Sequence, residues 1–185
     1  GPSGGGKTTL LRVLFDQHPN QCSFIHQDFA LVEQLSVYNN VYMGRLDQFI
    51  TSQNIKNLIF PIQHCVDEIE IILEEVGIRE KLYTRVGELS GGQKQRVAVA
   101  RALYHGRKIL LADEPISSVD PHRADELLSK IINSANTVVI SVHNVQLAIK
   151  FTNRLIGIRD GKIIFDDLTK NITKDQFDDL YTNLY

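Results

Sequence analysis

The stretch GPSGGGKT at residues 1–8 follows the pattern G-x4-G-K-[ST] in full. Its glycines let successive backbone N–H groups point at one anion, and the helix expected over Thr8–Asp16 presents its positive end to the same point. In such a loop Lys7 reaches the β- and γ-phosphates, and the hydroxyl of Thr8 binds magnesium. The alternative is a glycine-rich turn that only opens a helix. The loop predicts NTP binding, but it suits kinases and GTPases equally well.

Downstream of this loop, short apolar runs alternate with helical patterns, which predicts an α/β fold with a mainly parallel sheet. Strands are expected at residues 22–26, 108–112, 137–142 and 154–158, and a hairpin strand at 162–165 follows a turn at Gly161. Helical spacing marks residues 66–76, with Gly77 as the C-cap, and residues 124–132, with Asp120 as the N-cap and Pro121 at the first helical position.

One domain is expected over residues 1–185. Residues 29–84 lack strand alternation and are interpreted as a helical subdomain inserted into a P-loop NTPase (RecA-like) core. That core comprises residues 1–28 and 85–170, and residues 171–185 are expected to form a C-terminal helix.

Composition excludes several other classes of protein. The chain is 43% hydrophobic and 23% charged, which are ordinary globular values, and its apolar runs are too short to span a bilayer. No secretory leader is visible. A net charge of -2 gives no broad field for nucleic acid. Cys22 and Cys65 fit neither a metal pattern nor a disulfide framework, so they are expected to be buried, reduced thiols.

Two carboxylates end the apolar run ILLADE at residues 109–114. An acid at the carboxyl end of a buried strand is where a magnesium-associated aspartate belongs in an open α/β sheet, which assigns Asp113. Glu114 points elsewhere and can orient or deprotonate an attacking water. A strand that ends in a solvated acidic turn is the alternative, and the phosphate loop upstream makes it the weaker one.

The run LSGGQ at residues 89–93 continues as KQRVAVARAL to residue 103. Ser90 can cap a helix, Gly91 and Gly92 allow close backbone approach, and the helix dipole faces an anion. This run resembles the signature sequence of ABC ATPases. The resemblance implies that this surface covers ATP bound by a partner subunit, in a homodimer that sandwiches two ATP molecules with Mg²⁺.

The resemblance adds roles for three further positions. Gln27 matches the glutamine that contacts magnesium and relays the state of the membrane domains, and His143 matches the switch histidine at the γ-phosphate. Asp120 lies in the segment that crosses the dimer interface. Taken alone, each of these residues is more often structural. The implied catalytic residues are Glu114, His143, Lys7 and Gln27, and the implied metal ligands are Thr8, Gln27 and Asp113. The implied nucleotide contacts are Gly1, Pro2, Ser3, Gly4, Gly5, Gly6, Lys7, Thr8, Thr9, Ser90, Gly91, Gly92, Gln93 and Asp120.

Within the family, the chain is most similar to the ATPases of phosphonate importers, on residues 31–41, 112–121 and 154–165. This implies a peripheral protein at the cytoplasmic face of the inner membrane, with permease subunits as partners and, indirectly, a periplasmic solute-binding protein. The helix after Ser36 would face the permease, although Tyr38, Tyr42 and Met43 are equally suited to the core. The resemblance implies ATP-driven import of a small solute, with a phosphonate as the expected cargo and phosphate or an amino acid as the alternatives. A non-hydrolysing module, or a soluble ABC protein acting on DNA or ribosomes, are the alternatives.

The sequence departs from the family at two points. It begins at the phosphate loop, without the strand and the adenine-stacking aromatic that precede the loop in the family. Lys7 and Gln27 are also only 20 positions apart, too few for the β-hairpin that ABC ATPases carry there. The antiparallel β-subdomain is therefore expected to be largely missing. Weak ATP binding, slow hydrolysis and a tendency to aggregate are expected to follow.

Overall fold

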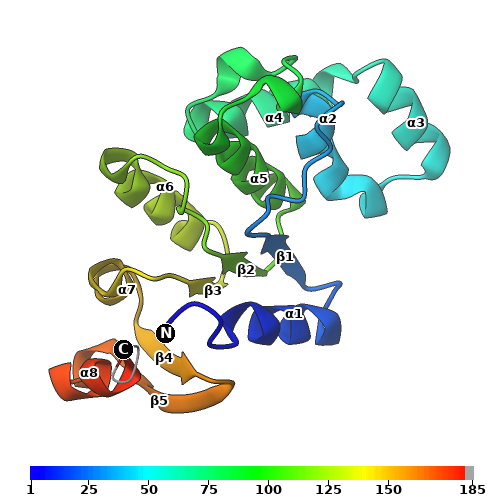
Figure 1. The fold of residues 1–185 in the computed structure, drawn as a ribbon. Coiled ribbons are helices and arrows are strands. Elements are labelled where there is room, and N and C mark those ends of the chain that lie inside the picture. Colours follow the sequence, from blue (N-terminus) through cyan, green and yellow to red (C-terminus); the bar gives the residue numbers. More distant parts are fainter. Residues whose placement is uncertain (182–185) are drawn as a thin grey trace.

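The computed structural model describes residues 1–181 and has an α/β architecture (Figure 1). Its main sheet holds three parallel strands in the order β1-β2-β3, namely β1 (Cys22–Ile25), β2 (Ile109–Asp113) and β3 (Thr137–Ser141). Ala112 is paired with Ile25 on one side and Ile140 on the other. For these three strands the expected ranges are confirmed to within one residue at each end.

Helices cover both faces of this sheet (Figure 1). Because side chains alternate along a strand, Phe24 and Leu111 pack with Leu11 of α1 (Lys7–Gln17) on one face. Ile25 and Leu110 belong to the large core on the other face, where α5 (Gly91–His105) lies. The crossover helices α6 (Pro121–Asn133) and α7 (Val145–Phe151) follow β2 and β3.

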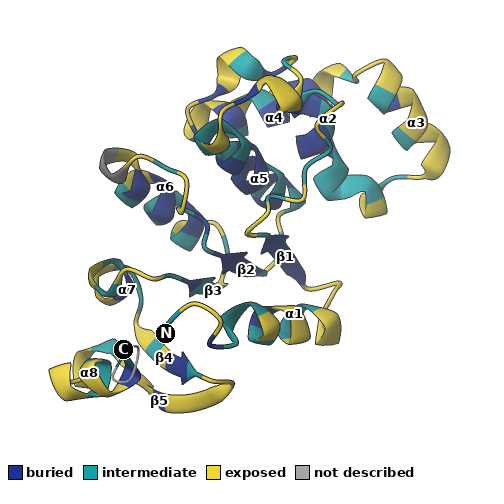
Figure 2. Ribbon diagram, in the orientation of Figure 1, coloured by how far each residue is buried: buried dark blue, intermediate teal, exposed yellow. Residues whose placement is uncertain are grey.

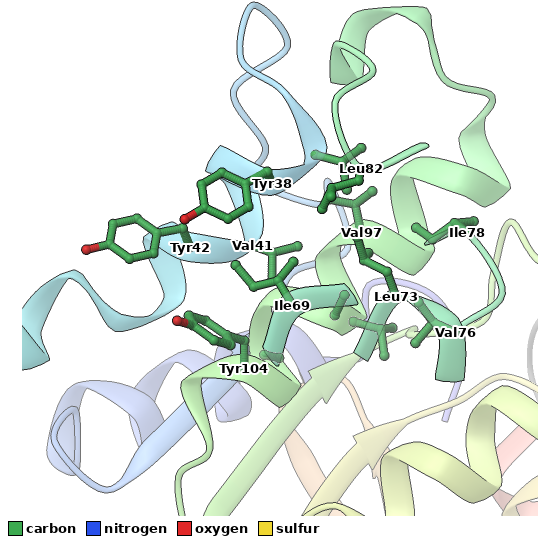
Figure 3. Packing of buried hydrophobic residues seen from close by; sticks show 14 of the residues in the cluster. Tyr38, Val41, Tyr42, Ile69, Leu73, Val76, Ile78, Leu82, Val97 and Tyr104 are labelled. Carbon is green, nitrogen blue, oxygen red and sulfur yellow. The ribbon is translucent and has the colours of Figure 1, made fainter. Parts of the chain in front are cut away.

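The region between β1 and α5 is helical, as expected. Its elements are α2 (Val37–Tyr42), η1 (Met43–Gln48), α3 (Thr51–Ile59), α4 (Gln63–Glu75), η2 (Arg79–Lys81) and η3 (Val86–Glu88). Ile69 and Leu73 of α4 pack with Val97 of α5 and with α2 in one core (Figure 3). Gly77 follows α4 with φ 71°, and the N–H of Ile78 donates to the carbonyl of Leu73, so the predicted cap is confirmed.

The helix after Ser36 belongs to the core rather than to the surface. Tyr38 and Tyr42 are each 1% exposed, and burial raises the pKa of both phenols. Several exposed apolar side chains of this helical region lie instead on and beside α3, where Ile55, Ile59 and Phe60 are more than half exposed. The sequence left these two possibilities for α2 open because both predict the same apolar spacing.

A second, two-stranded sheet is formed by β4 (Arg154–Arg159) and β5 (Lys162–Leu168), which pair antiparallel around Gly161. Within residues 1–181 neither strand pairs with β1–β3. One face of the hairpin packs on α8 (Lys174–Tyr181), where Phe165 meets Phe177 edge to face, whereas much of β5 is exposed (Figure 2). A short turn, η4 (Thr169–Asn171), precedes α8. The expected helix over 171–185 begins at Lys174, and residues 182–185 lie outside the described part.

Only the four residues 18–21 connect α1 to β1. No strand lies between these two elements in the described chain, as the short spacing from Lys7 to Gln27 predicts. Cys22 and Cys65 are both buried and unbridged, as expected.

Candidate functional site

The glycine-rich loop closes over its own lysine. Gly4 and Gly6 have φ of 76° and 104°, which glycine adopts without steric cost, and α1 begins directly after Gly6. The Nζ of Lys7 donates to the carbonyls of Gly1 (2.8 Å) and Pro2 (2.7 Å). Burial lowers the pKa of Lys7, and the carboxylates of Glu114 and Asp113 act in the opposite direction. The ammonium of Lys7 is therefore held by the carbonyls of residues 1 and 2, near the carboxylates of Asp113 and Glu114.

The β4–β5 hairpin packs against the glycine-rich loop. The N–H of Gly161 donates to the carbonyl of Gly5 at 3.0 Å, and a Cβ at Gly5 would come within 3.0 Å of the Ile158 carbonyl. A larger residue at position 5 would therefore push against the hairpin backbone, which would have to move by a few tenths of an ångström. Ser3, Gly4 and Thr9 are exposed, so this side of the loop is open to solvent.

The hydroxyl of Thr8 donates to Oδ2 of Asp113 at 2.6 Å, which joins the start of α1 to the end of β2. The other oxygen, Oδ1, accepts from Ser141 at the end of β3 (2.5 Å). Asp113 is only 2% exposed, so these two hydrogen bonds fix the orientation of a buried carboxylate.

Gln27 follows β1 and shares a cavity of about 330 Å³ with Thr8 and Asp113. The same cavity is lined by Arg12, Phe24, His26 and Asp28. A hydroxyl, a carboxylate and an amide oxygen are hard donors of the kind that Mg²⁺ takes, so the residues present suit this ion.

Glu114 and His143 meet above the same sheet edge, because Nε2 of His143 is hydrogen-bonded to Oε1 of Glu114. His143 is exposed and stands just before α7, whose first turn is capped by Asn144. Glu114 has φ 50°, a left-handed conformation that is uncommon for a residue with a side chain. From this backbone the carboxylate of Glu114 reaches the histidine, whereas that of Asp113 bonds Thr8 and Ser141.

The signature run forms the capped, exposed start of α5. The Oγ of Ser90 accepts from the N–H of Gln93 (3.3 Å), and the Oε1 of Gln93 accepts from the N–H of Ser90 (2.9 Å), which completes a capping box. Ser90 and Gly91 are exposed. A Cβ at Gly92 would lie 2.9 Å from the carbonyl of Ser118, so this glycine lets the loop after β2 lie against the start of α5.

Asp120 marks the start of α6, where its carbonyl accepts from the N–H groups of Arg123 and Ala124. The preceding loop therefore runs from the end of β2 past the start of α5. In the described residues no hydrogen bond joins Ser90–Gln93 to the glycine-rich loop at residues 1–8.

The structure thus brings Lys7, Thr8, Gln27, Asp113, Glu114 and His143 to the carboxyl edge of one parallel sheet. The signature residues form a separate surface on α5. No role was assigned from the sequence to three polar residues that bond segments of the site. Ser141 bonds Asp113, Gln95 bonds Glu114 and Ser118, and Arg101 bonds Phe29 and Ala30 just after Gln27. Each belongs to a run whose general pattern was recognised, but no local signal distinguishes a polar side chain that bonds the site from one that faces solvent.

Comparisons with known proteins agree with this geometry. A sequence profile described as ABC transporter matches residues 1–117. The chain is 39% identical over 210 positions to the phosphonates import ATP-binding protein PhnC 1 of Halalkalibacterium halodurans, covering 98% of this chain and 81% of that protein. It is 35% identical over 212 positions to PhnC 1 of Pseudomonas syringae, covering 99% and 79%. Both aligned spans exceed the 185 residues of this chain, so these relatives carry residues within the span that this chain lacks.

Solved structures share the fold. A putative metal-chelate type ABC transporter in an inward-facing conformation matches 98% of this chain and 76% of its own, with a TM-score of 0.81 and 26% identity. A dimeric ATP-binding cassette, MJ0796, bound to ADP and Pi matches 92% and 84% with a TM-score of 0.71 and 24% identity. The fold and the site define a P-loop nucleotide-binding protein. The chain belongs to the ABC transporter family.

Proposed function

We propose that this chain is the ATP-hydrolysing subunit of an ABC importer. The observation that carries the proposal is the hydrogen bond from Thr8 to Asp113, because it joins a phosphate-binding loop to the strand-end acid beside Glu114 and His143. That arrangement suits transfer of a terminal phosphoryl group to water.

The roles of the residues follow from their positions. The loop at residues 1–8 and the start of α1 supply N–H groups and Lys7 for the phosphates of ATP. Thr8, Gln27 and Asp113 would hold Mg²⁺, which supplies charge neutralisation when bound. Glu114 orients the attacking water and accepts its proton, and His143 holds the carboxylate of Glu114 and reaches the terminal phosphate.

We propose that the site is completed by a second copy. Ser90, Gly91 and the N–H groups of the first turn of α5 are exposed and present the positive end of a helix. That surface suits the terminal phosphate of ATP held by another molecule. The cassette MJ0796, whose fold this chain shares, is described as dimeric and bound to ADP and Pi, which supports a dimer for this chain.

The partners we propose are membrane permease subunits and, through them, a periplasmic solute-binding protein. No helix in the described part of the chain is both long and apolar enough to cross a bilayer. The exposed Ile50, Ile55, Ile59 and Phe60 on and beside α3 form an apolar surface suited to a permease loop. The proposed location is the cytoplasmic face of the inner membrane.

The cargo we propose is a phosphonate, since the relatives cited above are named phosphonates import proteins. Phosphate and amino acids are the other candidates. Uptake of a labelled phosphonate by cells that lack and regain this gene separates them, because only the true cargo depends on the chain.

Replacing Glu114 by Gln tests the enzymatic proposal. The substitution keeps the shape of the side chain but removes the base, so ATP turnover is expected to fall by about 100-fold or more while ATP still binds. Gel filtration with ATP and Mg²⁺ is expected to give a dimer for Glu114→Gln. A variant that stays monomeric with bound ATP would contradict the sandwich.

The alternative of a non-hydrolysing module makes a different prediction. It would leave ATP turnover at the background rate both with and without membrane partners. The meeting of Glu114 and His143 favours the enzyme.

A further inference from the structure

Gln95 joins the signature helix to the segment that follows β2. It lies in α5 and is 1% exposed. Its Nε2 donates to the carbonyl of Glu114 at 3.0 Å, and its Oε1 accepts from the N–H of Ser118 at 2.8 Å. One buried side-chain amide is therefore bonded at both ends to a single loop.

The upstream bond of Gln95 is made to a strained residue. Glu114 has φ 50°, and a left-handed residue with a side chain costs about 1–3 kcal/mol, so it must be held by its surroundings. From the opposite side, the N–H of Glu114 is directed at the carbonyl (3.2 Å) and the Oγ (3.0 Å) of Ser141. Gln95 and Ser141 thus fix the two peptide groups that flank the Glu114 Cα.

The downstream bond of Gln95 is made to a loop at the surface. Ser118 is exposed, and its carbonyl packs so closely on Gly92 that a Cβ there would come within 2.9 Å. The loop from Glu114 to Asp120 therefore touches the base at one end and the start of the signature helix at the other.

We propose that Gln95 is a positioning residue that couples this loop to the carboxylate of Glu114. The proposal rests on the proposed function, because it assigns Glu114 as the base and the Ser90–Gly92 surface to a second copy. When that copy closes on the loop and displaces Ser118, the amide of Gln95 cannot keep both bonds without moving the Glu114 carbonyl. Closure of the dimer is thereby transmitted to the base within the same chain.

Two substitutions of Gln95, each made in the whole chain, separate its bond to Glu114 from its bond to Ser118. Gln95→Met keeps the length of the side chain and removes both hydrogen bonds. Gln95→Glu keeps an acceptor for the Ser118 N–H but loses the donor to the Glu114 carbonyl. Both variants are expected to lower kcat by about 10- to 100-fold, because a displacement of the base by about 1 Å has that effect. The KM for ATP is expected to stay within about twofold, since Lys7 and the glycine-rich loop are untouched.

The pH profile gives a readout that a loss of stability would not produce. A carboxyl at this buried position is expected to take up a proton as the pH falls, and the protonated acid can donate to the Glu114 carbonyl. The ratio of kcat for Gln95→Glu to kcat for wild type is therefore expected to rise from pH 8 to pH 6. The same ratio for Gln95→Met is expected to stay flat.

Asn40→Leu is the matched control. Asn40 is also a buried helix amide, 0% exposed, and it bonds Val32 (2.8 Å to N, 3.0 Å to O) and the carbonyl of Ser36 (2.9 Å), away from the site. Its loss is expected to lower the melting temperature and leave kcat within about twofold. If Asn40→Leu lowers kcat as much as Gln95→Met, or if Gln95→Met hydrolyses ATP at the wild-type rate, the coupling role is wrong.

Amide hydrogen exchange tests the link without hydrolysis. Exchange in peptides covering residues 114–120 is expected to be faster in Gln95→Met than in wild type or Asn40→Leu. Unchanged exchange there overturns the inference even if the wild-type chain proves inactive. If the wild-type chain does not hydrolyse ATP but exchange is faster in Gln95→Met, the proposed function is contradicted and the link through Gln95 is not.

Discussion

Helices α2 and α4 of the core and the edge strand β3 both carry β-branched apolar side chains, but the exposed fraction of these side chains differs between them. Ile69 of α4 is 0% exposed, and Val41 of α2 is equally buried (Figure 3). In contrast, β3 reads TVVIS, a β-branched composition typical of an interior strand, but its Val139 and Ile140 are only half-buried. The comparison teaches that a strand's composition indicates the environment it suits, while its neighbours decide how much burial it receives.

The largest effect expected from this comparison is a difference between two isoleucines. Ile69→Ala removes a fully buried side chain and is expected to lower the free energy of unfolding by about 2–5 kcal/mol. Ile140→Ala at the half-buried edge is expected to cost about 1 kcal/mol, because less apolar surface is lost. Urea unfolding of both variants measures the two values. Equal losses would show that β3 is as well packed as the helical core.

A smaller effect is expected where the helical core is bonded to the segment after β1. The guanidinium of Arg101 in α5 donates to the carbonyls of Ala30 (2.5 Å) and Phe29 (2.8 Å), just after Gln27. Both acceptor residues have left-handed backbones, with φ of 46° and 65°. Arg101→Met is expected to cost about 1.5–3 kcal/mol, since bonds from a charged donor are lost.

A glycine at position 30 tests whether Arg101 stabilises the left-handed backbone of residues 29 and 30. Ala30→Gly removes the steric cost of the left-handed backbone, so it is expected to recover part of the stability lost in Arg101→Met. Chemical unfolding of the single and double variants measures the recovery. Strictly additive effects would indicate that Arg101 does not hold the strained turn.

Most of the fold could be predicted because the signals are local. Hydrophobic spacing and the glycine-rich loop located the strands and α1, and Ser90 predicted the cap of α5, to which the structure adds the side chain of Gln93. The remaining features depend on contacts between distant segments. The burial of Tyr38, and the hydrogen bonds from Gln95 and Ser141 to Glu114, follow from tertiary packing that sequence spacing does not encode.

The smallest effect concerns pH. His26 stacks on Phe24 with ring centroids 4.3 Å apart, and burial, together with the charge of Arg101, lowers the pKa of its imidazole. The unfolded chain therefore binds this proton more readily, so stability is expected to decrease as the pH falls below about 6.5. His26→Gln is expected to flatten that decrease. An unchanged slope in urea unfolding between pH 7 and pH 5 would exclude His26 as its source.

The central claim is that the glycine-rich loop of one copy and the signature of another form each site. Lys7→Ala removes the phosphate lysine, and Gly91→Asp places a negative charge at the start of α5, where a phosphate is expected. Each variant alone is expected to lose nearly all ATPase activity. In a mixture, the Gly91→Asp chain still supplies an intact loop and the Lys7→Ala chain an intact signature, so the rate is expected to rise several-fold above either variant. A mixture no more active than the mean of the two would contradict the shared site.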